Sequence, residues 1–192
     1  MILYVHGFNS SPASFKARLL QSRLAARGLG HAFAAPALPH RPRQALDLLA
    51  AEIARHPPGS MTLVGSSLGG WYATWLAERS DVRVVLLNPA VHPQRLLSGH
   101  VGRQRNLHTG EEYDFTADHV RELEEAGADA ITRPQRYFLI AATGDEVLDC
   151  RDAIAFYAGA RQVIVEGGDH GLSSFADHVE DVIDFAGIGP GR

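Results

Sequence analysis

The strongest candidate for a reactive group is a serine between glycines, in the segment 65–69, which reads Gly-Ser-Ser-Leu-Gly. This G-x-S-x-G pattern follows an apolar run typical of a strand and precedes a run typical of a helix, which is the context of a nucleophile elbow. At such a turn, flanking glycines let the backbone pass without Cβ clashes. We therefore predict that Ser67 is the nucleophile of an acyl-transfer reaction.

An alternative interpretation of the same pattern is a glycine-rich turn that binds an anion through the N–H groups of a helix. A Walker-type phosphate loop is excluded, because no Gly-Lys-Ser or Gly-Lys-Thr follows. The dinucleotide fingerprint also fails, because Gly65 has no second glycine two residues further on.

A serine is a weak nucleophile and needs a positioned base. Among the 10 histidines of the chain, His170 is singled out by its place in a glycine-rich segment after the last predicted strand and before the last predicted helix. Functional groups of open α/β sheets gather at the carboxyl ends of the strands. We therefore predict that His170 is the general base.

The supporting acid is expected at the end of another strand. Asp145 follows the apolar run 137–142, and the resulting chain order of nucleophile, acid and base is the order found in α/β hydrolases. The neighbouring Glu146 and Asp149 compete for the role, although Asp149 also suits the cap of the next helix. We predict that Asp145 orients the imidazole and stabilises the imidazolium as it forms.

Acyl transfer also needs backbone donors for the developing oxyanion. The N–H of Leu68, directly after the nucleophile, is one candidate, and the N–H of Phe8, in the loop after the first strand, is the second. We expect His6 mainly to stabilise that loop. Together with Asn9 and Asn88, His6 is also a candidate for lining the substrate site.

These groups must be brought together by a sheet. Apolar periodicity predicts strands over 2–5, 31–36, 61–64, 82–87, 137–142 and 162–165, and helices over 13–27, 43–55, 71–79 and 173–186, with a further helix around residues 154–156. Strands that alternate with helices imply a parallel sheet covered on both faces. The expected fold class is therefore α/β, an α/β-hydrolase fold with a mostly parallel sheet of about six strands, in one domain spanning 1–192.

Residues 92–133 interrupt this rhythm, between the strands that end near 87 and begin near 137. They are polar and contain no clear strand, and their back half, 117–126, is predicted to be an acidic helix. Because so long a connection is seldom plain loop, we expect a cap-like or lid-like excursion over the site. The alternative is a surface helix pair without a role. The basic side chains of this segment suggest an acidic substrate or, alternatively, a solvated polar face: Arg95, Arg103, Arg105 and His108.

Composition excludes several classes of protein. The net charge of −4 comes with no basic cluster, so no nucleic-acid partner is expected. Cys150 is the sole cysteine, which rules out an internal disulfide and a paired-cysteine metal or redox motif. No apolar run reaches the length of a membrane span, and the first residues resemble a strand more than a signal peptide. A cytoplasmic protein without a metal is the default expectation.

The quoted motifs resemble those of the YqiA-like esterases, a bacterial family of small α/β hydrolases. The similar segments are 4–12, 65–76, 88–91, 143–149 and 165–170. The resemblance implies esterase activity on short-chain acyl esters, no cofactor, a cytoplasmic location and the same serine, aspartate and histidine. The chain departs from relatives at Asp169 and Gly171, which flank the base and affect its tuning without removing the chemistry.

The predicted function is therefore a serine carboxylesterase that cleaves a small-molecule acyl ester through an acyl-enzyme on Ser67. One alternative is a thioesterase or amidase with the same triad. The other is a non-catalytic protein of this fold that binds a small molecule or a protein. No pattern in the sequence specifies an oligomeric state.

Overall fold

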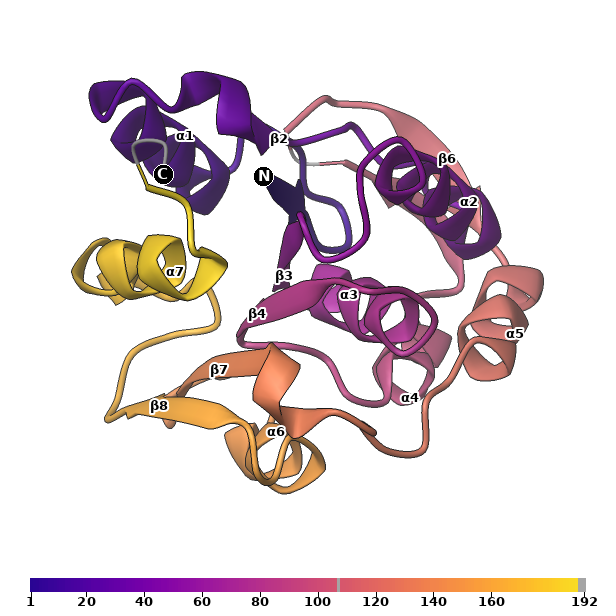
Figure 1. Ribbon diagram of the computed structural model, residues 1–192. Coiled ribbons are helices and arrows are strands. Elements are labelled where there is room, and N and C mark those ends of the chain that lie inside the picture. Colours follow the sequence, from indigo (N-terminus) through magenta and orange to yellow (C-terminus); the bar gives the residue numbers. More distant parts are fainter. Residues whose placement is uncertain (107, 190–192) are drawn as a thin grey trace.

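The structure, a computed structural model, describes residues 1–106 and 108–189. Leu107, inside the predicted excursion, and residues 190–192, at the end of the predicted domain, lie outside the described residues. A six-stranded sheet in the order β2-β1-β3-β4-β7-β8 forms the centre of the fold, and each neighbouring pair of strands is parallel (Figure 1). Its strands are β1 (Ile2–Val5), β2 (Phe33–Ala34), β3 (Thr62–Ser66), β4 (Arg83–Leu87), β7 (Tyr137–Ala142) and β8 (Arg161–Val165). The predicted sheet is confirmed.

The central strands are mostly apolar because both of their faces are covered. Every residue of β1, β3 and β7 is buried, as expected for a parallel sheet with helices on both sides. The edge strand β2 is shorter than the predicted 31–36: residues 30–32 form a 3₁₀ turn and only two residues pair with β1. The alanines of this stretch offer little side-chain packing to extend the pairing.

Two layers of helices sandwich the sheet. The helices are α1 (Phe15–Ala26), α2 (Pro42–Ile53), α3 (Leu68–Ala77), α6 (Cys150–Phe156) and α7 (Val179–Ala186). Leu3 and Val5 face the layer of α2, α3 and α6, whereas Ile2 and Tyr4 face the layer of α1 and α7. Figure 1 shows α1 and α7 together on one side of the sheet. Because strand side chains alternate, one sheet supplies both cores.

The predicted last helix, 173–186, is two elements. Residues Ser173–Asp177 form a 3₁₀ helix, and α7 begins after His178. The first turn is tightly wound because the Asp169 carboxylate accepts hydrogen bonds from the N–H and hydroxyl of Ser173, and 3₁₀ turns are common where helices begin. His178 therefore flanks α7 and is not in the interior of a helix.

The excursion 92–133 contains a β-hairpin, so the expectation that it has no strand is wrong. Its elements are α4 (Pro93–Leu97), a 3₁₀ turn (Ser98–His100), β5 (Gly102–Arg105), β6 (Glu112–Phe115) and α5 (Ala117–Glu125). β5 and β6 pair antiparallel, with Arg103 opposite Asp114 and its guanidinium 2.9 Å from the Glu112 carboxylate. Cross-strand charge pairs stabilise a strand that apolar content alone does not reveal.

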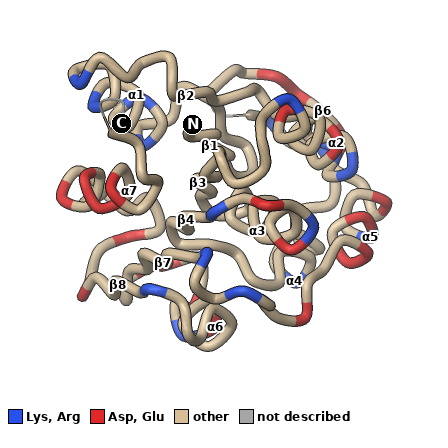
Figure 2. The backbone as a smooth tube through the Cα atoms, in the orientation of Figure 1, with Lys and Arg blue, Asp and Glu red and all other residues tan. Residues whose placement is uncertain are grey.

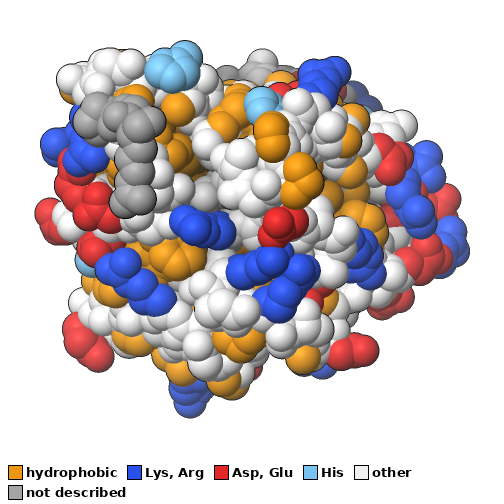
Figure 3. All heavy atoms as spheres, in the orientation of Figure 1, with side chains coloured by type: hydrophobic (Ala, Val, Ile, Leu, Met, Phe, Trp, Pro, Cys, Tyr) orange, Lys and Arg blue, Asp and Glu red, His pale blue; other side chains and the backbone are white. Residues whose placement is uncertain are grey.

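The acidic helix α5 is confirmed, and it lies against α2. The Glu122 carboxylate accepts hydrogen bonds from the Arg41 side chain and from the Arg43 N–H, at 2.7 and 3.0 Å. In Figure 2 the red residues of α5 lie beside α2. On the face of the molecule shown in Figure 3, blue and red side chains are interspersed with scattered hydrophobic ones. No helix in residues 1–106 or 108–189 is both long and apolar enough to cross a bilayer.

The connection from β3 to α3 is the tightest in the fold. A Cβ on Gly69 would lie 2.0 Å from the Val5 carbonyl oxygen, and a Cβ on Gly65 would lie 2.5 Å from the Gly69 carbonyl oxygen. Real atoms cannot approach so closely, so only glycine lets α3 start directly against the ends of β1 and β3.

We predict that Gly69→Ala destabilises the protein by about 3 kcal/mol or more, because the methyl group must displace the β1 backbone. Urea unfolding followed by circular dichroism measures the change. Gly99→Ala is the matched control: a Cβ there meets nothing within 4 Å, and stability should stay within about 1 kcal/mol of wild type. Equal stability of the two variants would contradict the close crossing.

Candidate active site

Ser67 occupies a sharp turn between β3 and α3. Its backbone has φ 54° and ψ −122°, a conformation that L-residues rarely adopt. The surrounding chain holds it there: the Ser67 N–H donates to the Leu87 carbonyl at 3.1 Å, and the Ser67 carbonyl accepts from the N–H groups of Gly70 and Ala90 at 2.9 and 3.1 Å. This strained geometry is typical of a nucleophile elbow and projects the side chain from the sheet edge.

The His170 ring reaches Ser67 from the loop after β8. The Nε2 atom of His170 is 3.1 Å from the Ser67 Oγ, and its Nδ1 atom is 2.8 and 3.0 Å from the two carboxylate oxygens of Asp145. A carboxylate can only accept, so Nδ1 carries the proton and Nε2 is free to accept one from the hydroxyl. The structure thus brings together the three residues that the sequence analysis placed at separate strand ends.

Asp145 is held as an anion at the end of β7. Its side chain is 3% exposed, and its Oδ1 accepts from the N–H groups of Val147 and Leu148 at 2.8 and 2.9 Å. Burial by itself raises the pKa of the Asp145 carboxyl, but the hydrogen bonds from His170, Leu148 and Val147 outweigh it, so the pKa lies below its ordinary value. The carboxylate is therefore ionised where the imidazole needs it.

The competing carboxylates have other partners. Asp149 caps α6, accepting from the Arg151 N–H at 2.9 Å, as its alternative interpretation required. The Asp169 carboxylate accepts hydrogen bonds from the N–H and the hydroxyl of Ser173. Glu146 accepts from the backbone N–H of His170 at 2.9 Å. Glu146 therefore holds the loop of the base, a contact that sequence reasoning missed.

Asn88 also holds this loop, and it does not line the substrate cavity as predicted. Its side chain donates to the carbonyls of Asp169 and His170 at 2.9 and 3.0 Å and accepts from the Ala142 N–H at 2.8 Å. Asn88 is 3% exposed with φ 43°. Because every polar atom of this amide has a protein partner, the residue ties β7 to the His170 loop. Its place at a strand end before a proline is the sequence signal for this role.

A cavity of about 430 Å³ opens beside the Ser67 hydroxyl. Its walls come from the segments that follow β1, β3, β4, β7 and β8 and from the start of the excursion, and they are mostly apolar. The lining residues are Phe8, Ser67, Leu68, Ala90, Pro93, Leu96, Leu97, His100, Glu146, Val147 and His170. The residues of α4 lie at the start of the excursion that was expected over the site, although no motif singled out its leucines.

Both predicted oxyanion donors line this cavity. Leu68 is the first residue of α3, so its N–H has no acceptor inside the helix. Phe8 follows Gly7, which passes so close to the elbow that a Cβ on it would lie 3.1 Å from the Ser66 carbonyl oxygen and from the Ser67 Cβ. The loop after β1 is thereby packed directly onto the nucleophile's turn.

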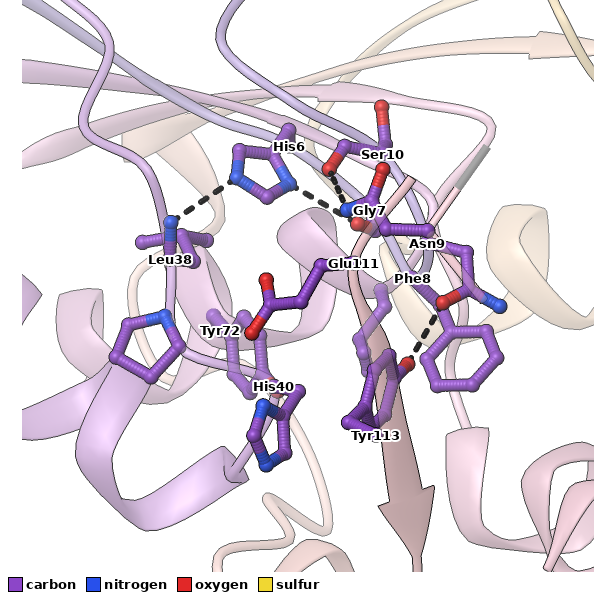
Figure 4. A pocket seen from close by; sticks show the side chains of 13 residues that line it. His6, Gly7, Phe8, Asn9, Ser10, Leu38, His40, Tyr72, Glu111 and Tyr113 are labelled. Atoms are coloured by element: carbon purple, nitrogen blue, oxygen red, sulfur yellow. Dashed lines mark hydrogen bonds between the residues drawn. The ribbon is translucent and has the colours of Figure 1, made fainter. Parts of the chain in front are cut away.

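His6 and Asn9 line a different, smaller cavity of about 40 Å³, not the Ser67 cavity (Figure 4). The His6 Nε2 accepts from the Leu38 N–H at 3.1 Å, and its Nδ1 lies 3.0 Å from the Gly7 carbonyl oxygen. Burial lowers the pKa of His6, which keeps it neutral for both contacts. The predicted loop-stabilising role fits this geometry, and the predicted substrate contact does not.

The aromatic side chains near the start of α3 do not line the Ser67 cavity. Trp71 and Tyr72 are 5% and 3% exposed and belong to the core. Among the described residues there is no group of three or more His, Cys, Asp or Glu side chains that could hold a metal ion.

The chain matches a known protein family over nearly its whole length. The model of the uncharacterised protein family UPF0227 matches residues 1–187. UPF0227 protein ECA1814 of Pectobacterium atrosepticum is 24% identical over 98% of this chain and 100% of its own length. UPF0227 protein YcfP of Salmonella newport is 25% identical over the same shares.

Solved structures show the same fold. The α/β hydrolase domain-containing protein 10 from mouse has a TM-score of 0.68 at 17% identity, covering 95% of this chain and 89% of that one. Est1E from Butyrivibrio proteoclasticus has a TM-score of 0.65 at 14% identity, covering 97% and 88%. The fold is that of the α/β hydrolases, and the family resemblance expected from the sequence is confirmed: this chain belongs to the UPF0227 family.

Proposed function

We propose that this protein is a serine hydrolase that cleaves small acyl esters through an acyl-enzyme on Ser67. The observation that carries the proposal is the continuous chain of contacts from the Ser67 hydroxyl through His170 to the buried Asp145, at the wall of an apolar cavity. The esterase domain of a Rhodothermus marinus protein shares this fold, which supports the same chemistry.

In the proposed reaction His170 Nε2 takes the proton of Ser67 as the Oγ attacks the ester carbonyl carbon. The electron pair of the carbonyl moves to its oxygen, and the N–H groups of Phe8 and Leu68 stabilise that oxyanion. Collapse expels the alcohol, which takes the proton from His170. Water then attacks the acyl-enzyme while His170 takes a proton from it. His170 returns the proton to the Ser67 oxygen, and the acid is released.

The cavity wall favours an uncharged apolar acyl group. Leu96, Leu97 and Val147 supply apolar surface, while Glu146 is a fixed negative charge at the same wall. Arg103, a candidate for binding an acidic substrate, is 64% exposed and pairs with Glu112 and Asp114 on the hairpin, which supports the solvated-face interpretation. A short neutral acyl chain is the proposed substrate.

We predict that a fluorophosphonate probe labels wild type on Ser67 and that Ser67→Ala folds normally but hydrolyses p-nitrophenyl butyrate at least about 10³-fold more slowly. Peptide mapping locates the adduct. Labelling at another residue, or equal turnover by the two proteins, would favour the non-catalytic binding alternative. Comparing kcat/KM for the oxygen ester, the thioester and the amide of the same acyl chain distinguishes an esterase from a thioesterase or an amidase.

Asn88→Asp tests whether the His170 loop must be held. The carboxylate keeps the acceptor for the Ala142 N–H but loses the donor to the Asp169 and His170 carbonyls. We expect kcat to fall by about ten- to a hundredfold with little change in KM, because a misplaced base affects the chemical step more than binding. A folded variant with wild-type kcat would contradict the positioning role.

Glu146→Gln tests the charge at the cavity wall. The amide oxygen can still accept from the His170 N–H, so only the charge is removed. Wild type should prefer a butyryl ester over the anionic succinyl ester, and the variant should lose about five- to tenfold of that preference. The measurement is the ratio of kcat/KM values, and an unchanged ratio would show that Glu146 does not act on the acyl group.

A further inference from the structure

The hairpin β5–β6 lies against the loop that follows β1, and the contact is made by specific hydrogen bonds. The Tyr113 hydroxyl, on β6, donates to the Asn9 Oδ1 at 2.7 Å, and the Asn9 Nδ2 donates to the Gln104 Oε1, on β5, at 3.3 Å. Figure 4 shows Tyr113 reaching Asn9 from the hairpin. Side chains from both strands of the hairpin therefore form hydrogen bonds with Asn9, the residue directly after Phe8.

A further hydrogen bond comes from the hairpin turn. The Asn106 Nδ2 donates to the Ser10 carbonyl at 2.8 Å, while its Oδ1 accepts from the N–H groups of His108 and Thr109 at 2.9 and 3.1 Å. One side chain thus shapes the turn and reaches the loop. The partners in these contacts are 95 to 104 residues apart in the sequence, so the contacts are tertiary constraints and not local turn bonds.

The ring of Phe8 packs against three aromatic side chains of the same excursion. Its centroid is 5.3 Å from that of Phe115, 6.5 Å from that of Tyr113 and 6.0 Å from that of His100, each with edge-to-face geometry. Aromatic pairs at such separations favour a fixed mutual orientation. Two kinds of contact therefore restrain Phe8: its ring packs against the excursion, and the two residues that follow it are hydrogen-bonded to the hairpin.

The loop needs this restraint because its backbone is strained. Asn9 has φ 51°, in the left-handed region, which costs free energy and persists only when the surroundings over-determine it. Burial raises the pKa of Tyr113 to about 12, so its hydroxyl keeps its proton and remains a donor to Asn9.

We propose that the β5–β6 hairpin is a brace that fixes the Phe8 N–H in the oxyanion site, with Tyr113 and Asn106 as positioning residues. This inference rests on the proposed hydrolase function. The excursion then has two roles in the site. Helix α4 lines the substrate cavity, and the hairpin positions an oxyanion donor by binding the loop that carries it.

Tyr113→Phe and Asn106→Asp test the brace, since each removes one donor to the loop. The first keeps the ring beside Phe8, and the second keeps the acceptor that shapes the turn. For each we expect kcat to fall about tenfold, less than the roughly hundredfold cost of deleting an oxyanion donor, with KM changed less than about twofold. Affinity for a boronic acid, which forms a tetrahedral adduct, should fall in step with kcat.

Glu112→Gln is the matched control, because Glu112 lies on the exposed side of β6 and pairs across the hairpin with Arg103. It should leave kcat and boronate affinity unchanged. Hydrogen exchange should show faster amide exchange over residues 7–11 in Tyr113→Phe at unchanged melting temperature.

The outcomes separate the two proposals. A Ser67-dependent activity with wild-type kcat and boronate affinity in both test variants would overturn the brace alone. An equal loss of kcat in Glu112→Gln would also overturn it, since the effect would then come from the hairpin's stability. Activity that survives Ser67→Ala would instead overturn the proposed function.

Discussion

The site depends on one backbone constraint, the left-handed turn that carries Ser67 between β3 and α3. The turn exists only because glycines at 65 and 69 allow helix and strand to cross at distances that a Cβ would forbid. Its strain is opposed by hydrogen bonds to Leu87 and Ala90, which anchor it to β4 and the segment beyond. A parallel sheet then delivers the other groups, because all its strands end at the same edge.

The loop that carries His170 is held less by the sheet than by polar side chains that bind its backbone. Asn88 and Glu146 bind the backbone of the His170 loop, and the Lys16 ammonium donates to the Gly171 carbonyl at 2.6 Å. On the other side of the nucleophile, the hairpin binds Asn9 and Ser10. Long-range hydrogen bonds to backbone and side-chain groups thus hold both loops in place.

Much of this arrangement was predictable from the sequence. Buried strands such as Tyr137–Ala142 have continuous apolar runs, and the triad residues sit at their ends beside glycines. The hairpin was missed because β5 reads Gly-Arg-Gln-Arg, with no apolar alternation, and the charged pair between its strands is recognisable only in the folded chain. Asn88 was assigned to the substrate site because a polar residue at a strand end looks the same whether it faces a cavity or a neighbouring loop. Only tertiary structure separates these cases.

The most direct measurement is a crystal structure of the protein after reaction with a small alkyl fluorophosphonate, whose adduct mimics the tetrahedral intermediate. The account predicts a covalent bond from Ser67 Oγ to phosphorus, with the phosphoryl oxygen about 2.7–3.1 Å from the N–H groups of both Phe8 and Leu68 and the alkyl group in the cavity beside Leu96 and Leu97. An adduct whose phosphoryl oxygen points away from these two donors, or one formed on another residue, would contradict it.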